Sequence, residues 1–221
     1  MFILLGFGLL STKGFGQNTD PGSVSAQTRL GKYTAEKTLE NMVGSPYFNK
    51  DWQKGTVKFA NGKVFKDMEV KYNLVDDKLV LKSETGEAMT IVDPVSEFRL
   101  PTSNGEAFFK SGFRPLGKHT ERTFYQVLFD GNIKLLKRLN KSIIESQNYN
   151  SPSPVKTIDE SVHYYFVKND ELIEFKPTKK AILQLLKDKS EQVNSVLSNI
   201  KGDLKEDETL KSVFVYYNSL I

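Results

Sequence analysis

The sequence has no cysteine, and this absence excludes disulfide bonds, thiolate nucleophiles, zinc fingers and iron–sulfur ligation together. It has only two histidines, His119 and His163, and neither a His-x-His nor a His-Glu-x-x-His spacing. A Gly-x-Ser-x-Gly elbow, a Walker or Rossmann glycine pattern and an EF-hand loop are also missing. We therefore expect no metal, no cofactor and no enzymatic activity, although a Ser–His–Asp triad assembled from distant parts of a chain leaves no sequence signature.

Long apolar runs are scarce, and the one at the start of the chain, residues 2–10, is too short to cross a bilayer as a helix. Small residues follow it, ending in GFG at residues 14–16, which is the pattern that a signal peptidase cleaves. We expect residues 1–16 to be a secretory signal, although no Lys or Arg precedes the apolar run; a buried N-terminal strand is the alternative. We expect a periplasmic or extracellular protein with no lipid anchor and no membrane span.

The sequence also has only a small excess of positive charge. The net charge is +4, and removal of residues 1–16 takes away Lys13 and no acid, which leaves 30 − 27 = +3. The densest basic run is KLLKRLNK at residues 134–141, where leucines interleave with the charges. This run predicts a strand or helix with one solvated face, and a polyanion site is the less favoured interpretation. We expect no nucleic-acid partner.

The chain does contain enough apolar sequence to bury a core, because 38% of its 221 residues are hydrophobic and 26% are charged. We expect a flexible leader at residues 17–32, because this stretch is polar and contains Pro and Gly. A region of helix and antiparallel sheet follows at residues 33–176. The last part, residues 177–221, is expected to be helical and to pack on the same core.

A short amphipathic helix is expected at the beginning of the sheet region. Thr34 can cap its start, and Leu39, Met42 and Val43 fall on one face at helical spacing. Gly44 and the proline two residues later would end it. After this helix the hydrophobic period changes from near four to two, which indicates strands.

Dipeptides that favour tight turns recur between short runs of alternating polarity, and they predict a series of antiparallel hairpins. The turn dipeptides are NG at 61–62, DD at 76–77, TG at 85–86, DG at 130–131 and ND at 169–170. We expect Asn61 and Gly62 to form a two-residue primed turn that pairs Phe59 with Val64. The other expected pairs are Leu74–Leu79, Tyr72–Leu81, Leu128–Ile133, Val167–Leu172 and Tyr164–Phe175. Five side chains are expected to share one core face: Val70, Tyr72, Leu74, Leu79 and Leu81.

Three helices are expected in the tail. Thr178 can cap the first, Asp188 and Glu191 can form a capping box for the second, and acidic residues open the third. The VFVYY segment of the third helix could also form a strand. The apolar stripes are, in order, Ala181, Ile182, Leu185 and Leu186; Val193, Val196, Leu197 and Ile200; and Leu210, Val213, Phe214 and Tyr217.

Together these patterns predict an α+β fold. We expect an antiparallel β-meander of about eight to ten strands, in the form of a curved sheet or half-barrel. One N-terminal helix and about three C-terminal helices would cover part of its apolar face. A half-open barrel around a helix is one version, similar by analogy to the lipoprotein-carrier type of envelope fold.

One aromatic cluster, Tyr47, Phe48 and Trp52, precedes the first hairpin. We favour a plug that closes one end of the core, and the alternative is a surface that stacks on a flat ligand or contacts a partner. The acidic groups at residues 76–77, 159–160 and 206–208 each have a structural explanation, in a turn, a loop and a helix start. Both histidines are expected to be surface side chains.

Three segments carry a resemblance to a known family: GSPYFNKDWQKGTVKFANGKVFKDMEVKYNLVDDKLVLK at residues 44–82, YYFVKNDELIEFKPTKKAILQLLKDK at 164–189 and YYNSL at 216–220. They resemble a family of uncharacterised secreted proteins of Bacteroidetes bacteria. The resemblance rests on turn glycines, strand aromatics and helix leucines, so it implies an exported location and no activity.

Two function classes follow from the sequence. We expect a non-enzymatic secreted or periplasmic protein that binds an envelope protein partner or an apolar ligand, with the oligomeric state left open. The alternative is a hydrolase that acts on envelope polymers. A cavity inside the sheet would favour ligand binding, and a flat apolar patch would favour a protein partner. A cleft where His119 or His163 meets carboxylates would favour the enzyme.

Overall fold

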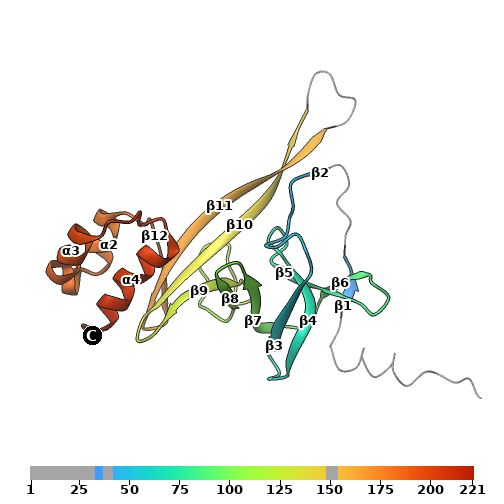
Figure 1. Ribbon diagram of the computed structural model, residues 1–221, viewed down its shortest axis with the longest axis horizontal. Helices are drawn as coiled ribbons and strands as arrows, with labels where there is room; N and C mark the ends of the chain where they lie inside the picture. Colours follow the sequence, from blue (N-terminus) through green and yellow to red (C-terminus); the bar gives the residue numbers. More distant parts are fainter. Residues whose placement is uncertain (1–32, 37–41, 148–153) are drawn as a thin grey trace, which may run out of the picture. The chain divides into compact units, whose positions relative to one another are not determined.

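The computed structural model describes residues 33–36, 42–147 and 154–221, and the fold of these residues is an antiparallel sheet followed by helices (Figure 1). The strands are β1 Tyr33–Ala35, β2 Met42–Val43, β3 Gln53–Phe59, β4 Val64–Asn73, β5 Lys78–Lys82, β6 Ala88–Ile91, β7 Val95–Thr102, β8 Gly105–Lys110, β9 Tyr125–Asp130, β10 Lys134–Ser146, β11 Val155–Lys168 and β12 Glu171–Phe175. The helices are α2 Lys179–Leu185, α3 Ser190–Asn199 and α4 Asp207–Asn218, with a 3₁₀ turn, η1, at Lys187–Lys189. The expected signal (1–16) and leader (17–32) lie outside the described residues.

The sheet has 12 strands in the order β1-β6-β5-β4-β3-β7-β8-β9-β10-β11-β12, with β2 paired in parallel to β11. All other pairs are antiparallel, and most join neighbours in the sequence, so the predicted antiparallel sheet is confirmed. Its end strands β1 and β12 do not pair with each other, so the sheet is not closed. Hairpins dominate because each short loop returns the chain beside the strand that it has just formed.

The first half of the sheet builds a core without any help from the helices of the described chain. Its buried residues come from β3–β8 and the segment before β9: Val57, Phe59, Val70, Tyr72, Leu74, Leu79, Leu81, Ile91, Phe98, Leu100, Ala107, Phe109 and Phe124. The expected shared face of Val70, Tyr72, Leu74, Leu79 and Leu81 is confirmed, because all five are in this cluster. The tail does not cover this part of the apolar face.

The second half of the sheet, β9–β12, is buried on both faces around the start of β10 and the end of β11. On one face Leu135 and Phe166 pack with residues of all three helices, which Figure 1 shows next to β12. On the other face Leu136 and Tyr165 pack under Leu116 and other residues of the loop between β8 and β9. Adjacent residues of one strand point to opposite faces, so the pairs Leu135-Leu136 and Tyr165-Phe166 each supply both cores.

The described residues do not form the N-terminal helix that was expected between Thr34 and Gly44. Thr34 lies in β1, which pairs with β6, and Met42 and Val43 form β2. Leu39 and its neighbours at 37–41 lie outside the described residues. Pairing with exposed strand edges outweighs helix propensity at both ends of this segment.

The turn at Asn61 and Gly62 differs from the predicted primed turn. Gly62 has φ +84° and donates its N–H to Phe59 O, whereas Asn61 keeps a negative φ. Phe59 N–H bonds to Lys63 O, and Lys58 pairs with Val64, so the predicted pair of Phe59 with Val64 is wrong by one residue. This is the three-residue loop in which a glycine with positive φ forms a bulge.

Two other predicted registers are also wrong, and two reversals are confirmed. Tyr72 pairs with Leu79, not Leu81, and Leu74 belongs to a longer loop. Asp130 pairs with Lys134, so Leu128 does not face Ile133. By contrast, Lys82 pairs with Ala88 around the turn at 85–86, and the pairs Val167–Leu172 and Tyr164–Phe175 form as predicted. Asn169 and Asp170 have φ of +54° and +59°, so they form a primed turn of the kind that the sequence predicted for Asn61 and Gly62.

A Gly62→Ala variant tests the bulged turn. No heavy atom lies within 4 Å of the position that its Cβ would take, so the expected loss is backbone strain alone. We expect the free energy of unfolding to fall by about 1 kcal/mol, because an L residue at positive φ is strained. The measurement is urea denaturation, with Ala60→Ser as a control in the same loop. Equal stability of wild type and Gly62→Ala would contradict this turn geometry.

Candidate functional site

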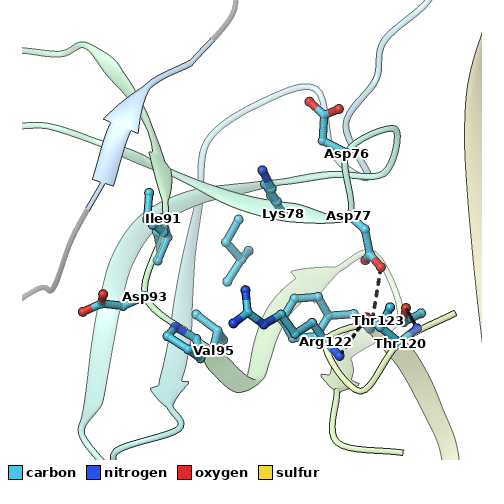
Figure 2. Close-up of a pocket in the computed structure, with 13 residues that line it drawn as sticks. Asp76, Asp77, Lys78, Ile91, Asp93, Val95, Thr120, Arg122 and Thr123 are labelled. Atoms are coloured by element: carbon cyan, nitrogen blue, oxygen red, sulfur yellow. Dashed lines mark hydrogen bonds between the residues drawn. The ribbon is translucent and has the colours of Figure 1, made fainter. Parts of the chain in front are cut away.

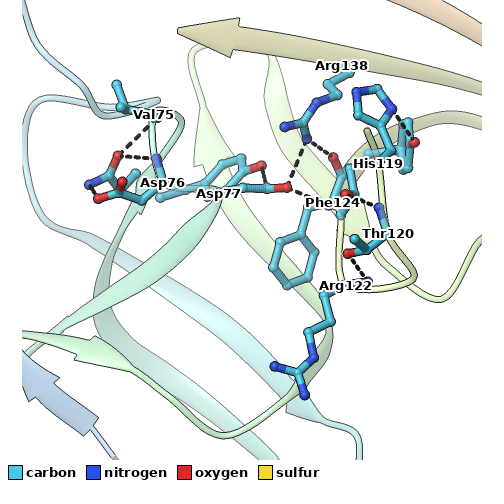
Figure 3. Close-up of polar contacts among 12 residues, drawn as sticks. Val75, Asp76, Asp77, His119, Thr120, Arg122, Phe124 and Arg138 are labelled. Carbon is cyan, nitrogen blue, oxygen red and sulfur yellow. Dashed lines mark hydrogen bonds and ion pairs between the residues drawn. The ribbon is translucent and has the colours of Figure 1, made fainter. Parts of the chain in front are cut away.

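A buried ion pair joins the two halves of the sheet. Arg138 on β10 donates from Nη1 to Asp77 Oδ2 at 3.1 Å and to the carbonyl oxygen of Phe124 at 3.0 Å (Figure 3). The side chains are only 10% and 19% exposed, so both charges are largely removed from water. Burial alone would lower the pKa of Arg138, but the carboxylate of Asp77, with contributions from Tyr72 and Tyr125, raises it above its ordinary value.

Asp77 is the hub of this network because both of its carboxylate oxygens are engaged. Tyr72 donates its hydroxyl proton to Oδ1, and the Phe124 N–H approaches Oδ2 at 3.4 Å. Burial, and next the charge of Asp77, raise the pKa of Tyr72 well above its ordinary value, so this hydroxyl stays protonated and donates. Asp77 closes the β4–β5 turn at φ +55°, a conformation that Asp tolerates better than most residues.

One pocket lies on the Asp77 side of the ion pair (Figure 2). Its volume is about 230 Å³, and its lining comes from Asp76–Leu79, Ile91–Val95, Thr120 and Arg122–Phe124. Its most buried charge, Asp77, already binds Arg138, Tyr72 and Phe124. Of the remaining charged residues of the lining, Asp76, Lys78 and Arg122 are exposed and Asp93 is half-buried. This pocket is therefore small and its buried charge is satisfied.

A larger pocket lies on the Arg138 side, and we call it the two-histidine pocket. It has a volume of about 670 Å³ and is lined by Leu116, Gly117, Lys118, His119, Arg138, Asn140, Ser161, His163, Tyr165, Leu172, Ile173 and Glu174. The loop at 116–119 forms one wall, and β10, β11 and β12 form the other. Arg138 pairs with His163 and Asn140 with Ser161 in the β10–β11 register, so the strand alternation brings these four side chains to one face.

His119 is held in place by aromatic rings. Its Nδ1 lies 2.9 Å from the hydroxyl of Tyr125, and its ring is 5.8 Å from the rings of both Tyr125 and Tyr165. Burial, followed by the positive charges of Arg138 and Lys118, lowers the pKa of His119, and burial raises the pKa of Tyr125 to about 12. His119 is therefore neutral at pH 7, with Nε2 as its remaining polar atom.

The lowered pKa of His119 predicts a specific pH dependence of stability. The imidazole of His119 has a pKa of about 6.5 in the unfolded chain and a lower pKa in the folded chain. His119 therefore contributes stability above about pH 6.5, and this contribution is lost as the pH falls. Arg138 and Lys118 oppose the proton, whereas Glu174 and Asp77 favour it. We expect His119→Asn to flatten the decline of the unfolding free energy between about pH 7.5 and pH 5.5. Identical slopes for wild type and variant in urea denaturation would contradict this assignment.

Ser161, His163 and Glu174 form a row of contacting side chains on β11 and β12, across the pocket from the loop that carries His119. The Nδ1 of His163 lies 2.7 Å from Glu174 Oε1, and its Nε2 lies 3.3 Å from Ser161 Oγ. The His163 and Glu174 side chains are 41% and 50% exposed, so the row faces solvent at the mouth. The sequence predicted that both histidines are surface side chains, and the exposure of His163 agrees with this prediction. Both histidines nevertheless line the same pocket.

Two buried groups at this pocket have hydrogen-bonding capacity to spare. Both hydrogen bonds that Arg138 donates to other described residues come from Nη1. The N–H groups of Nε and Nη2 therefore have no acceptor among the described residues. No bond to another described residue engages the hydroxyl of Tyr165, a residue that is 1% exposed and lines the same pocket. No fully buried side-chain polar atom among the described residues lacks a partner, so these free groups reach the open volume. Burial, and next the charge of Glu174, raise the pKa of Tyr165, which keeps its hydroxyl a donor.

The aromatic cluster that the sequence singled out is divided by the fold. Phe48 packs against the first core, with its ring edge-on to Phe109 at 5.2 Å. Tyr47 and Trp52 instead face the ammonium group of Lys71, at 5.0 Å and 4.7 Å from their ring centroids. Their role as a ligand or partner surface stays a prediction, and none of the three lines the two-histidine pocket.

The basic run at 134–141 is distributed over both faces of β10, and its cations pair with carboxylates. Lys134 pairs with Asp130, Lys137 with Asp207 and Lys141 with Glu160, besides the pair of Arg138. The strand β10 therefore does not present a concentrated basic patch. In the described ranges, no group of three or more His, Asp or Glu residues is placed to hold a metal ion.

Sequence reasoning missed Asp77, Arg138 and Glu174 as parts of a site. Asp77 was interpreted as a turn residue and Arg138 as one charge of a basic run. The available signal was the adjacent Leu135-Leu136 pair, because two neighbouring apolar residues in a strand indicate burial on both faces. Arg138 lies two positions after Leu136 and so shares its face, where a buried arginine is expected to have a partner.

Comparison with known proteins assigns no family, since no family model, curated protein or solved structure matches the chain. No helix in the part of the chain that the structure describes is long and apolar enough to cross a membrane.

Proposed function

We propose that this is an exported protein that binds a small ligand with a carboxylate or phosphate group in the two-histidine pocket. The observation that carries the proposal is the pair of buried donors there, the Nε and Nη2 groups of Arg138 and the hydroxyl of Tyr165. These donors face the open volume of the pocket, so an oxygen anion bound there would accept charge-assisted hydrogen bonds from Arg138 in place of bonds to water. Arg is the side chain that best matches the two oxygens of such a group.

The lining of the pocket favours a polar ligand over the apolar ligand that the sequence predicted. Lys118, Asn140 and Ser161 add donors around the two histidines, whereas Leu116, Leu172 and Ile173 supply an apolar side. A volume of about 670 Å³ lies in the range of small-molecule sites. The first core is filled by its own aromatic rings, which supports a ligand at the sheet surface instead of one inside the sheet.

Export is part of the proposal, and the sequence of residues 1–16, an apolar run followed by small residues, motivates it. The absence of cysteine is compatible with export because a chain of this length can be stable through its core alone. A protein partner remains the second binding mode. It is supported by Val43 and Ile144, which flank Thr157 in the register of β2, β11 and β10 and are 62% and 49% exposed.

An NMR titration tests ligand binding. The Cε1–H resonances of His119 and His163 report on the two sides of the pocket, and the probes are acetate and inorganic phosphate at constant ionic strength and pH. We expect at least one probe to shift both resonances with a saturable curve. Lys118→Ala is expected to weaken that affinity by about 3–10-fold, because it removes one donor and one charge at the rim.

The matched control is Lys82→Ala, which also removes one positive charge but pairs with Glu69 away from the pocket. Its affinity is expected to equal that of the wild type. Linear, non-saturating shifts with both probes, or the same weakening in both lysine variants, would overturn the proposed site.

A further inference from the structure

The row of Ser161, His163 and Glu174 has the connectivity of a nucleophile, a base and an orienting carboxylate. We propose that this row cleaves carboxylic esters that bind in the two-histidine pocket, with Ser161 as nucleophile and His163 as general base. The inference rests on the proposed function for the substrate, because the acid part of the ester would occupy the site of the oxygen anion. It goes beyond that function because it adds a covalent reaction to binding.

The geometry meets the requirements for an activated serine. Glu174 Oε1 at 2.7 Å from Nδ1 accepts the proton of that nitrogen and leaves Nε2 of His163 as a lone-pair acceptor. Ser161 Oγ at 3.3 Å from Nε2 is within the looser range that nucleophile–base pairs show before substrate binds. Ser161 and His163 are two residues apart on β11, which puts both side chains on the pocket face.

Donors for the developing oxyanion come from the neighbouring strand. Asn140 is the register partner of Ser161, and Arg138 is the register partner of His163, and both line the pocket. The amide of Asn140 and the free N–H groups of Arg138 can therefore approach a carbonyl oxygen attacked by Ser161. Such donors contribute most where charge develops in the transition state.

The reaction balances without any co-reactant besides water. Ser161 Oγ forms a bond to the ester carbonyl carbon while its proton passes to His163 Nε2. The carbon–oxygen bond to the alcohol then breaks, and the alcohol leaves with that proton. Water attacks the acyl-serine, gives its proton to Nε2, and the serine oxygen leaves with it as the acid is released. Glu174 is a positioning residue that holds the tautomer of His163.

A surface ion pair alone explains less of this arrangement. An exposed His–Glu pair contributes little to stability, and such a pair does not require a serine on the second ring nitrogen. The row also opens into the same volume as the spare donors of Arg138 and Tyr165. The pocket thus holds a nucleophile, a base and anion donors on one face of three strands.

The test uses the full chain with two probes, p-nitrophenyl acetate as substrate and diisopropyl fluorophosphate as a serine label located by peptide mass spectrometry. We expect the label on Ser161 and hydrolysis above the buffer rate. Ser161→Ala is expected to abolish both, and His163→Gln to slow both by about 100-fold or more. Glu174→Gln is expected to lower kcat by about tenfold with little change in KM, and Glu174→Asp to restore part of it.

The control is Ser142→Ala, which removes a serine from the same hairpin and is expected to change neither readout, because Ser142 pairs with Asp159 and does not line the pocket. Labelling spread over several serines, or labelling of Ser161 that is unchanged in His163→Gln, would overturn the catalytic assignment. Anion binding with no labelling of Ser161 would reject this inference alone. Labelling of Ser161 with no saturable anion binding would reject the proposed function alone.

Discussion

An Asp77→Ala variant is expected to lose about 3–5 kcal/mol of the free energy of unfolding, because it leaves the charge of Arg138 buried without its counter-ion. Arg138 is 10% exposed and cannot turn to solvent without also breaking its bond to Phe124. The change also removes the acceptor of the Tyr72 hydroxyl. Urea denaturation at pH 7 is the measurement.

The adjacent residue provides the matched control. Asp76 is exposed and its carboxylate approaches only Asn73 Nδ2 at 3.2 Å, so Asp76→Ala is expected to change stability by about 1 kcal/mol or less. Asp77→Asn keeps the shape and tolerates positive φ, so it separates charge from backbone strain; we expect about 2–3 kcal/mol. If Asp76→Ala and Asp77→Ala lose the same amount, the ion pair is not the link between the two halves of the sheet.

A Phe109→Ala variant is the second large effect, with an expected loss of about 3–5 kcal/mol. Phe109 is 3% exposed and lies in the centre of the first core, stacked on Phe98 at 4.7 Å and edge-on to Tyr72 at 5.1 Å. Removal of the ring leaves a cavity that the surrounding aromatic rings cannot fill without leaving their own contacts.

The neighbouring ring on β8 is the control for this prediction. Phe108 points to the opposite face, where the guanidinium carbon of Arg99 lies 4.0 Å from its centroid, and it is only partly buried. Phe108→Ala is expected to lose about 1 kcal/mol, from a half-exposed cation–π contact. Similar losses for the two variants in urea denaturation would show that β8 does not have one core face and one solvent face.

The hairpin pattern could be predicted from alternation and turn residues, but the registers could not. At 169–170 both central residues adopt positive φ and the predicted pairs form. At 61–62 only Gly62 does, since Asn61 uses its Oδ1 to accept the Lys63 N–H, which stabilises a longer loop and moves the register by one residue. Such competition between side chain and backbone is decided by the twist of the flanking strands, which no dipeptide reveals.

The candidate site could not be predicted from the sequence, for a different reason. It combines a loop at 116–119, two residues of β10, three of β11 and three of β12, and only the sheet register brings them together. The sequence predicted that the helices cover part of the apolar face, but it did not indicate which part. The tail packs on β9–β12, and the first half of the sheet fills its core with its own aromatic side chains. Alternation alone does not tell which element covers an apolar face.

The central claim, that spare donors of a buried arginine bind an oxygen anion, is tested most directly on Arg138 itself. The measurement follows the Arg Nε–H resonances of ¹⁵N-labelled protein during titration with inorganic phosphate at constant ionic strength. We predict a saturable shift of Arg138, with Arg99, Arg114 and Arg122 unmoved as internal controls outside the two-histidine pocket. A stationary Arg138 resonance, or a shift of Arg138 no larger than those of Arg99, Arg114 and Arg122, would contradict the claim.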